Sequence, residues 1–373
     1  MRSTVVIVLA VTALTWANSA VDSVASGSEA VAQRKAKRSE MMEQYKRRWA
    51  AIESAIEAMR AEKSAFYVRH QADVDVRAWA IGECMEKLAA AEQAEQQELS
   101  QRIDAALTEA RQMVDALAGG RDYFGAKRGS LLRGIAVDGQ QHPEPYAVHV
   151  PNTYDAGRSW PLFVYLHGGG GSVDQARYAL DRVYTASKAD GETSEPPALA
   201  TGEYIKIWLP RRGEHWAEAA NEDSVFAAID DMKANYNIDA DRVYVQGFSM
   251  GGLASMHFAV RYPGELAGSG PSGMPNVGAF LPFVENLTNL PMYLCHGSRD
   301  DTCQPANSLM LFDRLRAGAY DAMLVMDAQL GHGTPAETRA GQEFWLLSKT
   351  RNRFPRRVVY MTDDLRYHRA YWI

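Results

Sequence analysis

The sequence predicts an α/β fold, a doubly wound and mostly parallel sheet, preceded by an α-helical hairpin or coiled-coil segment. Two observations support this prediction. All 15 prolines lie at or after Pro143, so the first third of the chain has the composition of long helices and the remainder does not. Beyond that point, short apolar runs typical of buried strands alternate with stretches of helical apolar spacing. That alternation is typical of a parallel sheet with helices on both faces.

Composition describes an ordinary globular chain. Its 373 residues, 46% hydrophobic and 23% charged, are enough for two or three domains. The formal net charge of −6 argues against a nucleic-acid partner held through phosphate contacts. The three cysteines lack metal-binding spacing, so neither a zinc site nor a disulfide framework is expected. Two alternatives stay open for Cys295 and Cys303: they form one disulfide bond, or they are separate thiols.

Residues 1–19 have the pattern of a secretory signal peptide. Arg2 precedes an apolar run from Val5 to Trp16, and small residues follow at Ala17 and Ser19. The alternative is an uncleaved N-terminal anchor. Because the apolar run is short for a membrane span, we expect a secreted or periplasmic protein with no transmembrane domain in its mature form.

Residues 29–118 are predicted to form a helical, coiled-coil-like segment. Two apolar seams recur at alternating spacings of three and four. They are Met42, Tyr45, Trp49, Ile52, Ile56 and Met59, then Leu99, Ile103, Ala106, Ala110, Met113 and Leu117. If the helix breaks near residues 70–75, the two halves form an antiparallel hairpin. If it does not break, they form one extended coiled coil. This segment could mediate self-association or bind a protein partner. Since Gly119 and Gly120 end it, the α/β unit is expected to stay soluble and active without residues 1–120.

Residues 131–350 are predicted to form the α/β unit itself. Its expected strands are Leu131–Val137, Tyr146–Val150, Pro161–Leu166, Tyr204–Leu209, Val243–Val245, Pro291–Cys295 and Ala322–Met326. Residues 174–197 are expected to be a helix and a polar loop, residues 211–216 a candidate cleft wall, and residues 271–289 a loop over the cleft. Residues 351–373 form a tail with two strand-like runs, 358–361 and 369–373.

The run Gly247-Phe248-Ser249-Met250-Gly251 marks a strand, a sharp turn and a helix. Glycine on both sides lets strand and helix approach closely while the Ser249 hydroxyl stays exposed. Three other strands also end in polar or glycine-rich turns: residues 167–171 are His-Gly-Gly-Gly-Gly, residues 296–301 contain Asp300 and Asp301, and His332 lies between two glycines. Ligand sites form at the carboxyl ends of such strands.

These residues, together with residues 236–245 (Tyr-Asn-Ile-Asp-Ala-Asp-Arg-Val-Tyr-Val), resemble the α/β-hydrolase superfamily. The resemblance covers about Leu131 to Thr350 and is closest to the esterase and prolyl-oligopeptidase-like group, which includes feruloyl esterases and polyhydroxybutyrate depolymerases. It implies that the acid is the third residue after His-Gly, which selects Asp300 over its neighbour Asp301.

The chemistry expected of these residues is acyl transfer. An imidazole must take the proton of a serine hydroxyl during attack, so Ser249 is the candidate nucleophile, His332 the base and Asp300 the acid that orients it. The backbone N–H of Met250, with one from Gly169 or Gly170, would form the oxyanion hole. No metal or organic cofactor is required.

The sequence therefore favours a secreted serine hydrolase that cleaves carboxylic esters, on a small molecule or a polymer, through a covalent acyl-enzyme. Two alternatives stay open. One is a prolyl-oligopeptidase-like serine peptidase, and the other is an inert hydrolase fold that acts as a binding or scaffold protein through residues 29–118.

Overall fold

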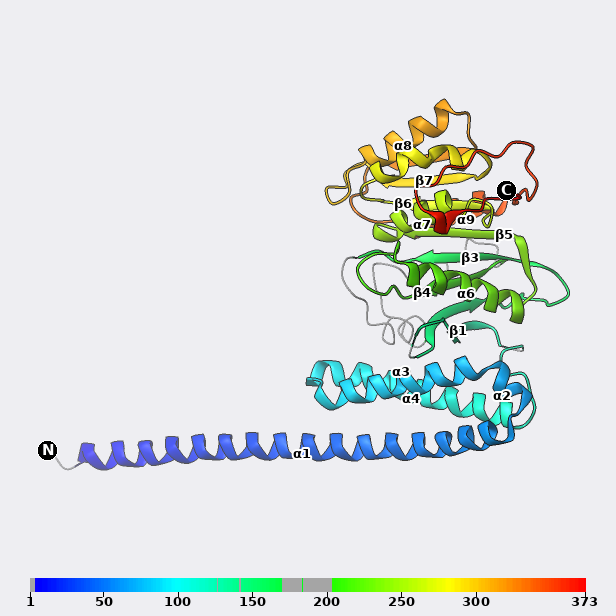
Figure 1. The fold of residues 1–373 in the computed structure, drawn as a ribbon. Helices are drawn as coiled ribbons and strands as arrows, with labels where there is room; N and C mark the ends of the chain where they lie inside the picture. The colour runs from blue at the N-terminus through cyan, green and yellow to red at the C-terminus, as the bar shows by residue number, and fades with distance from the viewer. Residues whose placement is uncertain (1–3, 126, 141, 170–182, 184–202) are drawn as a thin grey trace.

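The computed structural model describes residues 4–125, 127–140, 142–169, 183 and 203–373 (Figure 1). Within these residues, eight strands form one sheet in the order β1-β2-β4-β3-β5-β6-β7-β8. The pairs β1/β2 and β2/β4 are antiparallel, and all pairs from β4 to β8 are parallel. The strands are β1 (Gly129–Ile135), β2 (Glu144–Val150), β3 (Trp160–Leu166), β4 (Ile205–Leu209), β5 (Ile238–Phe248), β6 (Gly268–Ser272), β7 (Met292–Gly297) and β8 (Ala322–Asp327). The predicted mostly parallel sheet is confirmed, and each strand predicted between residues 131 and 350 overlaps an observed one.

Helices cover both faces of the sheet, so several of its strands are buried along their whole length. Every residue of β3, β4 and β7 is buried. The flanking helices are α6 (Ala219–Asn235), α7 (Met250–Arg261), α8 (Ala306–Ala317) and α9 (Ala336–Leu347). The helix and loop predicted for residues 174–197 lie outside the described residues, apart from residue 183.

Strand β6 was not predicted, because Gly-Ser-Gly-Pro-Ser has no strand propensity. The packing explains its composition. All five residues are buried, and a Cβ added to Gly270 would lie 2.6 Å from the side chain of Gln342 on α9. Small residues are needed here because α9 lies directly on the strand. Part of the predicted cleft loop, residues 271–289, is thus strand, and Gly278–Asn289 form a 3-10 helix, η2.

The tail is irregular, and neither strand-like run, residues 358–361 or 369–373, forms a strand. A short 3-10 helix, η3 (Leu365–Tyr367), holds the tail to the core. The Tyr367 hydroxyl donates a hydrogen bond to Glu222 on α6 over 2.8 Å. Within the two runs only Ala370 is buried, and Met361, Trp372 and Ile373 are about half exposed, so apolar residues here do not mark sheet pairing.

The helical segment has more breaks than predicted. It consists of α1 (Thr4–Glu62), α2 (Ala65–Arg69), α3 (Gln71–Ala90) and α4 (Gln93–Ala118). The chain first turns at Lys63, whose φ is 50°. It breaks again at His70, within the predicted range of residues 70–75, and a third time at Ala91 and Glu92. In Figure 1, α1 lies beside the α3–α4 pair and runs well beyond it. Both predicted seams are largely buried, with Ile52 and Ile103 at their centres.

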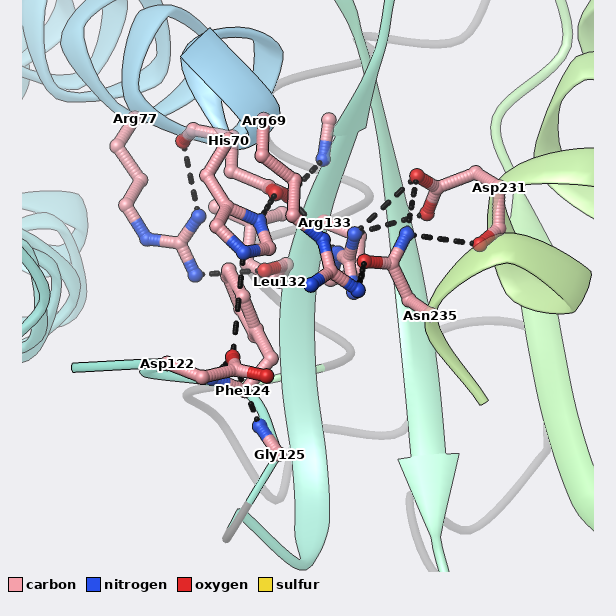
Figure 2. Close-up of polar contacts among 12 residues, drawn as sticks. Arg69, His70, Arg77, Asp122, Phe124, Gly125, Leu132, Arg133, Asp231 and Asn235 are labelled. Atoms are coloured by element: carbon pink, nitrogen blue, oxygen red, sulfur yellow. Dashed lines mark hydrogen bonds and ion pairs between the residues drawn. The ribbon is translucent and has the colours of Figure 1, made fainter. Parts of the chain in front are cut away.

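A buried polar network joins the helical segment to the sheet (Figure 2). Asp73 on α3 accepts hydrogen bonds from Arg133 Nε and from the Gly134 backbone N–H of β1, each over 2.9 Å, and from His70 Nδ1 over 3.0 Å. Arg133 also pairs with Asp231 on α6 at 2.9 Å. Burial alone would raise the pKa of Asp73, but the charge of Arg133 and the His70 hydrogen bond hold it below its ordinary value.

This buried network of Asp73, Arg133 and Asp231, which we call the joint, changes what we expect of a protein that lacks residues 1–120. Arg133 and Asp73 are each at most 2% exposed. Deletion of residues 1–120 removes Asp73, so the Arg133 side chain and the Gly134 N–H would lose this partner and become exposed to solvent. We therefore no longer expect residues 131–350 to stay soluble alone. No helix in the described part of the chain is both long and apolar enough to cross a membrane.

Candidate active site

Ser249 occupies a strained turn between β5 and α7. Its φ is 56° and its ψ is −119°, a conformation that is costly for any residue with a side chain. A Cβ added to Gly247 would lie 2.3 Å from the Gly251 carbonyl oxygen, and one added to Gly251 would lie 1.8 Å from that of Leu166 on β3. Both flanking positions must therefore be glycine, as the sequence predicted. The Ser249 N–H donates to the Ser272 carbonyl over 2.9 Å and so fixes the turn to β6.

His332 and Asp300 lie in line with the serine hydroxyl. Ser249 Oγ is 3.0 Å from His332 Nε2, and His332 Nδ1 is 2.7 Å from Asp300 Oδ2. A carboxylate only accepts, so Nδ1 carries the proton and Nε2 is free to accept the hydroxyl hydrogen. The Phe248 ring packs on the imidazole with 4.7 Å between centroids. Asp301 is exposed, and its carboxylate accepts from Thr302 Oγ1 over 3.5 Å, so the structure brings Asp300, and not Asp301, to the histidine.

The Asp300 carboxylate is held by its own loop. Its Oδ1 accepts from the backbone N–H of Thr302 over 3.0 Å and of Cys303 over 2.7 Å. Burial acts to raise the pKa of Asp300, but these N–H groups and the His332 ring outweigh it and leave the pKa below its ordinary value. The carboxylate is therefore ionised at neutral pH.

Two backbone hydrogen bonds tie the acid loop to the histidine loop. The Ser298 N–H donates to the Asp327 carbonyl over 2.7 Å, and the Arg299 N–H donates to the Leu330 carbonyl over 2.9 Å. Adjacent parallel strands β7 and β8 thus deliver the acid and the base at a fixed separation.

The glycine loop after β3 passes beside the serine. A Cβ added to Gly168 would lie 3.1 Å from Ser249 Cβ. Gly169 has a φ of +87°, and Met250 is the first residue of α7. Gly170, the other predicted oxyanion residue, lies outside the described residues.

Arg211 and Trp216, the two ends of the predicted cleft wall, support this loop. The Arg211 backbone N–H donates to His167 Nε2 over 3.1 Å, and the Trp216 indole N–H donates to the His167 carbonyl over 3.1 Å. His167 Nε2 is therefore an acceptor, so its Nδ1 carries the proton and donates to the Gly168 carbonyl over 2.7 Å. Both Arg211 and Trp216 are buried. The middle of the predicted cleft wall, residues 213–215, is exposed.

Sequence reasoning missed two residues that contact the acid or the serine. His296, at the end of β7, is 3.3 Å from Asp300 Oδ2 and is anchored by Ser308 on α8. The Cys303 thiol lies against the Ser249 hydroxyl, and burial raises the pKa of that thiol. Cys303 and Cys295 are both free. The signal for His296 was its place directly before a glycine at a strand end, the same signal that marked Asp300.

Comparison with known proteins gives a match to one family and several partial relatives. Residues 206–334 match the family model described as phospholipase/carboxylesterase. A bifunctional acetylxylan esterase/xylanase of Neocallimastix patriciarum is 32% identical over 160 residues, which are 41% of this chain and 21% of that protein. The aligned region thus spans about a fifth of the length of that relative.

A second relative and a solved structure extend the comparison. Lysophospholipase-like protein 1 of Mus musculus is 27% identical over 177 residues, which are 42% of this chain and 74% of that protein. The crystal structure of a thermostable esterase is 21% identical, covers 60% of this chain and 63% of its own, and has a TM-score of 0.48.

Proposed function

We propose that the α/β unit is a hydrolase of the esterase group and that it cleaves carboxylic esters by acyl transfer through Ser249, His332 and Asp300. The observation that supports this most directly is the pair of hydrogen bonds, 3.0 and 2.7 Å, that link hydroxyl, imidazole and carboxylate in order. The nucleophile, the base and the acid each follow the carboxyl end of a parallel strand.

In the proposed first step, Ser249 Oγ forms a bond to the ester carbonyl carbon while His332 Nε2 takes the hydroxyl proton. The Asp300 carboxylate stabilises the resulting imidazolium through Nδ1. The tetrahedral intermediate collapses as the bond to the alcohol oxygen breaks, and Nε2 gives its proton to that alcohol. Water then attacks the acyl-enzyme with His332 as base, which releases the carboxylic acid and restores Ser249.

We assign the oxyanion hole to the backbone N–H groups of Met250 and Gly169. The amide of Met250 is at the N-terminus of α7, where N–H groups are unpaired and the helix dipole favours negative charge. For Gly169, the argument comes from the trans peptide plane, in which C=O and N–H point in opposite directions. Because His167 holds the Gly168 carbonyl, the Gly169 N–H points away from that ring. Gly170 is a second candidate that the described residues do not address.

We further propose that esters are preferred strongly to peptide amides. An amide nitrogen leaves only when it is protonated in the transition state, which demands tight positioning by subsites along the peptide. In residues 131–169 and 203–350, as far as they are described, no inserted domain supplies such subsites. The name of the first relative specifies an acetyl ester on xylan, which supports polymer-borne esters as candidate substrates.

Secretion is part of the proposal and rests on the sequence of residues 1–19. If these residues are a signal peptide, α1 is shorter in the mature protein and begins after Ser19 or Ala20. N-terminal sequencing of protein recovered from the periplasm or medium of an expressing cell tests this, and an intact Met1 on that protein would contradict it.

The proposed activity is tested with the purified protein on p-nitrophenyl esters, feruloyl esters and matched peptide amides. We expect ester turnover, with a single serine labelled by a fluorophosphonate, and peptide mapping should place the label on Ser249. Labelling of another serine would overturn the assignment. Comparable kcat/KM on an amide and its ester analogue would promote the peptidase alternative.

A further inference from the structure

We propose that His296 is a positioning residue for the catalytic acid, holding Asp300 toward His332 through a hydrogen-bonded pair with Ser308. This rests on the proposed function, in which Asp300 orients the base. His296 ends β7 and Ser308 lies on α8, so the pair connects a helix outside the triad to the acid loop.

The contacts of His296 fix its tautomer. His296 Nε2 is 2.9 Å from the Cys303 carbonyl oxygen, which only accepts, so Nε2 carries a proton. Nδ1 lies 2.6 Å from Ser308 Oγ and, in the neutral ring, accepts the hydroxyl hydrogen. Both side chains are almost completely buried, at 2% exposure for His296 and none for Ser308. The ring therefore has a defined orientation.

The same Nε2–H group faces the acid. Nε2 is 3.3 Å from Asp300 Oδ2, the oxygen that also binds His332 Nδ1. One N–H thus spans both the carbonyl of Cys303 and the carboxylate of Asp300. Because the Cys303 N–H in turn donates to Asp300 Oδ1, the ring holds both ends of the loop that carries the acid.

The consequence is specific to catalysis. Without the His296 N–H, Asp300 keeps its backbone donors on Oδ1, but among the described residues His332 alone then fixes the direction of Oδ2. The carboxylate can then rotate away from the line that joins it to His332. A displacement of this kind affects the transition state, in which His332 is charged, more than substrate binding.

Replacement of His296 by leucine and by glutamine separates this role from packing. Glutamine places an amide N–H near the position of Nε2, whereas leucine fills similar space without a donor. We expect His296→Leu to lower kcat by about 10- to 100-fold with KM nearly unchanged, the order of loss that misplacement by 1 Å causes. We expect His296→Gln to restore most of this loss. Rates are normalised to active sites titrated with a fluorophosphonate, so unfolded protein does not contribute.

Ser308→Ala gives a milder test, since it removes only the anchor of the ring, and we expect an intermediate loss of kcat. Its matched control is Ser224→Ala on α6. Ser224 is equally buried and donates to Glu144 over 2.7 Å, but it touches none of the triad. We expect the control to keep its kcat. Equal kcat for His296→Leu and His296→Gln, or a change in KM alone, would overturn the proposal.

A measurement without substrate separates this proposal from the proposed function. The proton between His332 Nδ1 and Asp300 should give a low-field 1H NMR resonance that shifts in His296→Leu and is retained in His296→Gln. If the native protein hydrolyses no ester but this pattern holds, the esterase proposal fails and the positioning role stands. If esters are hydrolysed and neither kcat nor the resonance distinguishes the two variants, only the positioning role fails.

Discussion

Replacement of Asp73 by alanine should destabilise the whole protein, although this residue is far from the candidate active site in sequence. The carboxylate accepts three buried hydrogen bonds, from Arg133 Nε, the Gly134 N–H and His70 Nδ1. The change leaves Arg133 with Asp231 as its remaining carboxylate partner in the network of Figure 2. It also leaves one backbone N–H and one imidazole N–H unpaired inside the protein.

The magnitude follows from these losses. Removal of one partner of a buried ion pair costs about 3–5 kcal/mol. Each unpaired buried donor carries a further penalty of about 1–3 kcal/mol, but the terms overlap and Asp231 compensates in part. We therefore expect a loss of about 3–5 kcal/mol in the free energy of unfolding, a large part of the total stability of a typical domain.

The assay is urea denaturation followed by far-UV circular dichroism and tryptophan fluorescence together. The control is Glu83→Ala on the same helix, α3. Glu83 pairs with Lys87 at 3.7 Å, and both side chains are more than a third exposed. We expect that control to change stability by less than about 1 kcal/mol. A loss for Asp73→Ala no larger than that of the control would refute the reasoning that the joint is part of one folded unit.

The same variant predicts a pH dependence. Because the pKa of Asp73 is lowered in the folded protein, its contribution is present above the ordinary carboxyl pKa and is lost as pH falls through the lowered value. The difference in the free energy of unfolding between the native protein and Asp73→Ala should therefore have its maximum value at pH 7 and decrease below about pH 4. A difference that grows on acidification would contradict the assigned direction.

Three further predictions concern the candidate active site. Ser249→Ala should lower kcat by about 10⁵- to 10⁶-fold with an unchanged circular dichroism spectrum, and adding His332→Ala should cost little more because the triad acts as a unit. Asp300→Asn should lower kcat by about 10⁴-fold, whereas Asp301→Asn should stay within a few-fold, and the reverse order would move the acid by one residue. Gly251→Ala should give little soluble protein, since the added Cβ would lie 1.8 Å from a carbonyl oxygen of β3, and normal yield with normal activity would contradict the packing.

The sheet and the reacting residues were predictable because their signals are local. Most of the parallel strands contain an apolar run, and Ser249, Asp300 and His332 each lie within a few residues of the end of such a strand. Strand β6 was not predictable, since its small residues are set by the distance to α9, which lies more than 60 residues further along the chain. Because the residues of β6 are small to make room for α9, β6 lacks the apolar pattern by which strands are predicted.

The joint and the surroundings of the acid were missed for a related reason. In the sequence, nothing distinguishes three charged residues, Asp73, Arg133 and Asp231, from ordinary surface charges. They form a buried network because the fold brings their side chains into contact. Likewise, Ser308 on α8 has no sequence feature that connects it to His296. The periodicity and spacing of residues do not predict contacts between side chains that are far apart in the sequence.

The joint also determines which edge of the sheet another protein strand could extend. At an edge strand such as β1, the backbone groups that face away from the sheet are free to pair with a foreign chain, which is a route to aggregation. Here the Gly134 N–H is held by Asp73, and the Leu132 carbonyl accepts from Arg77 over 2.6 Å. Two side chains of α3 thus occupy the positions where a ninth strand would hydrogen-bond. The helical segment therefore prevents strand addition at β1.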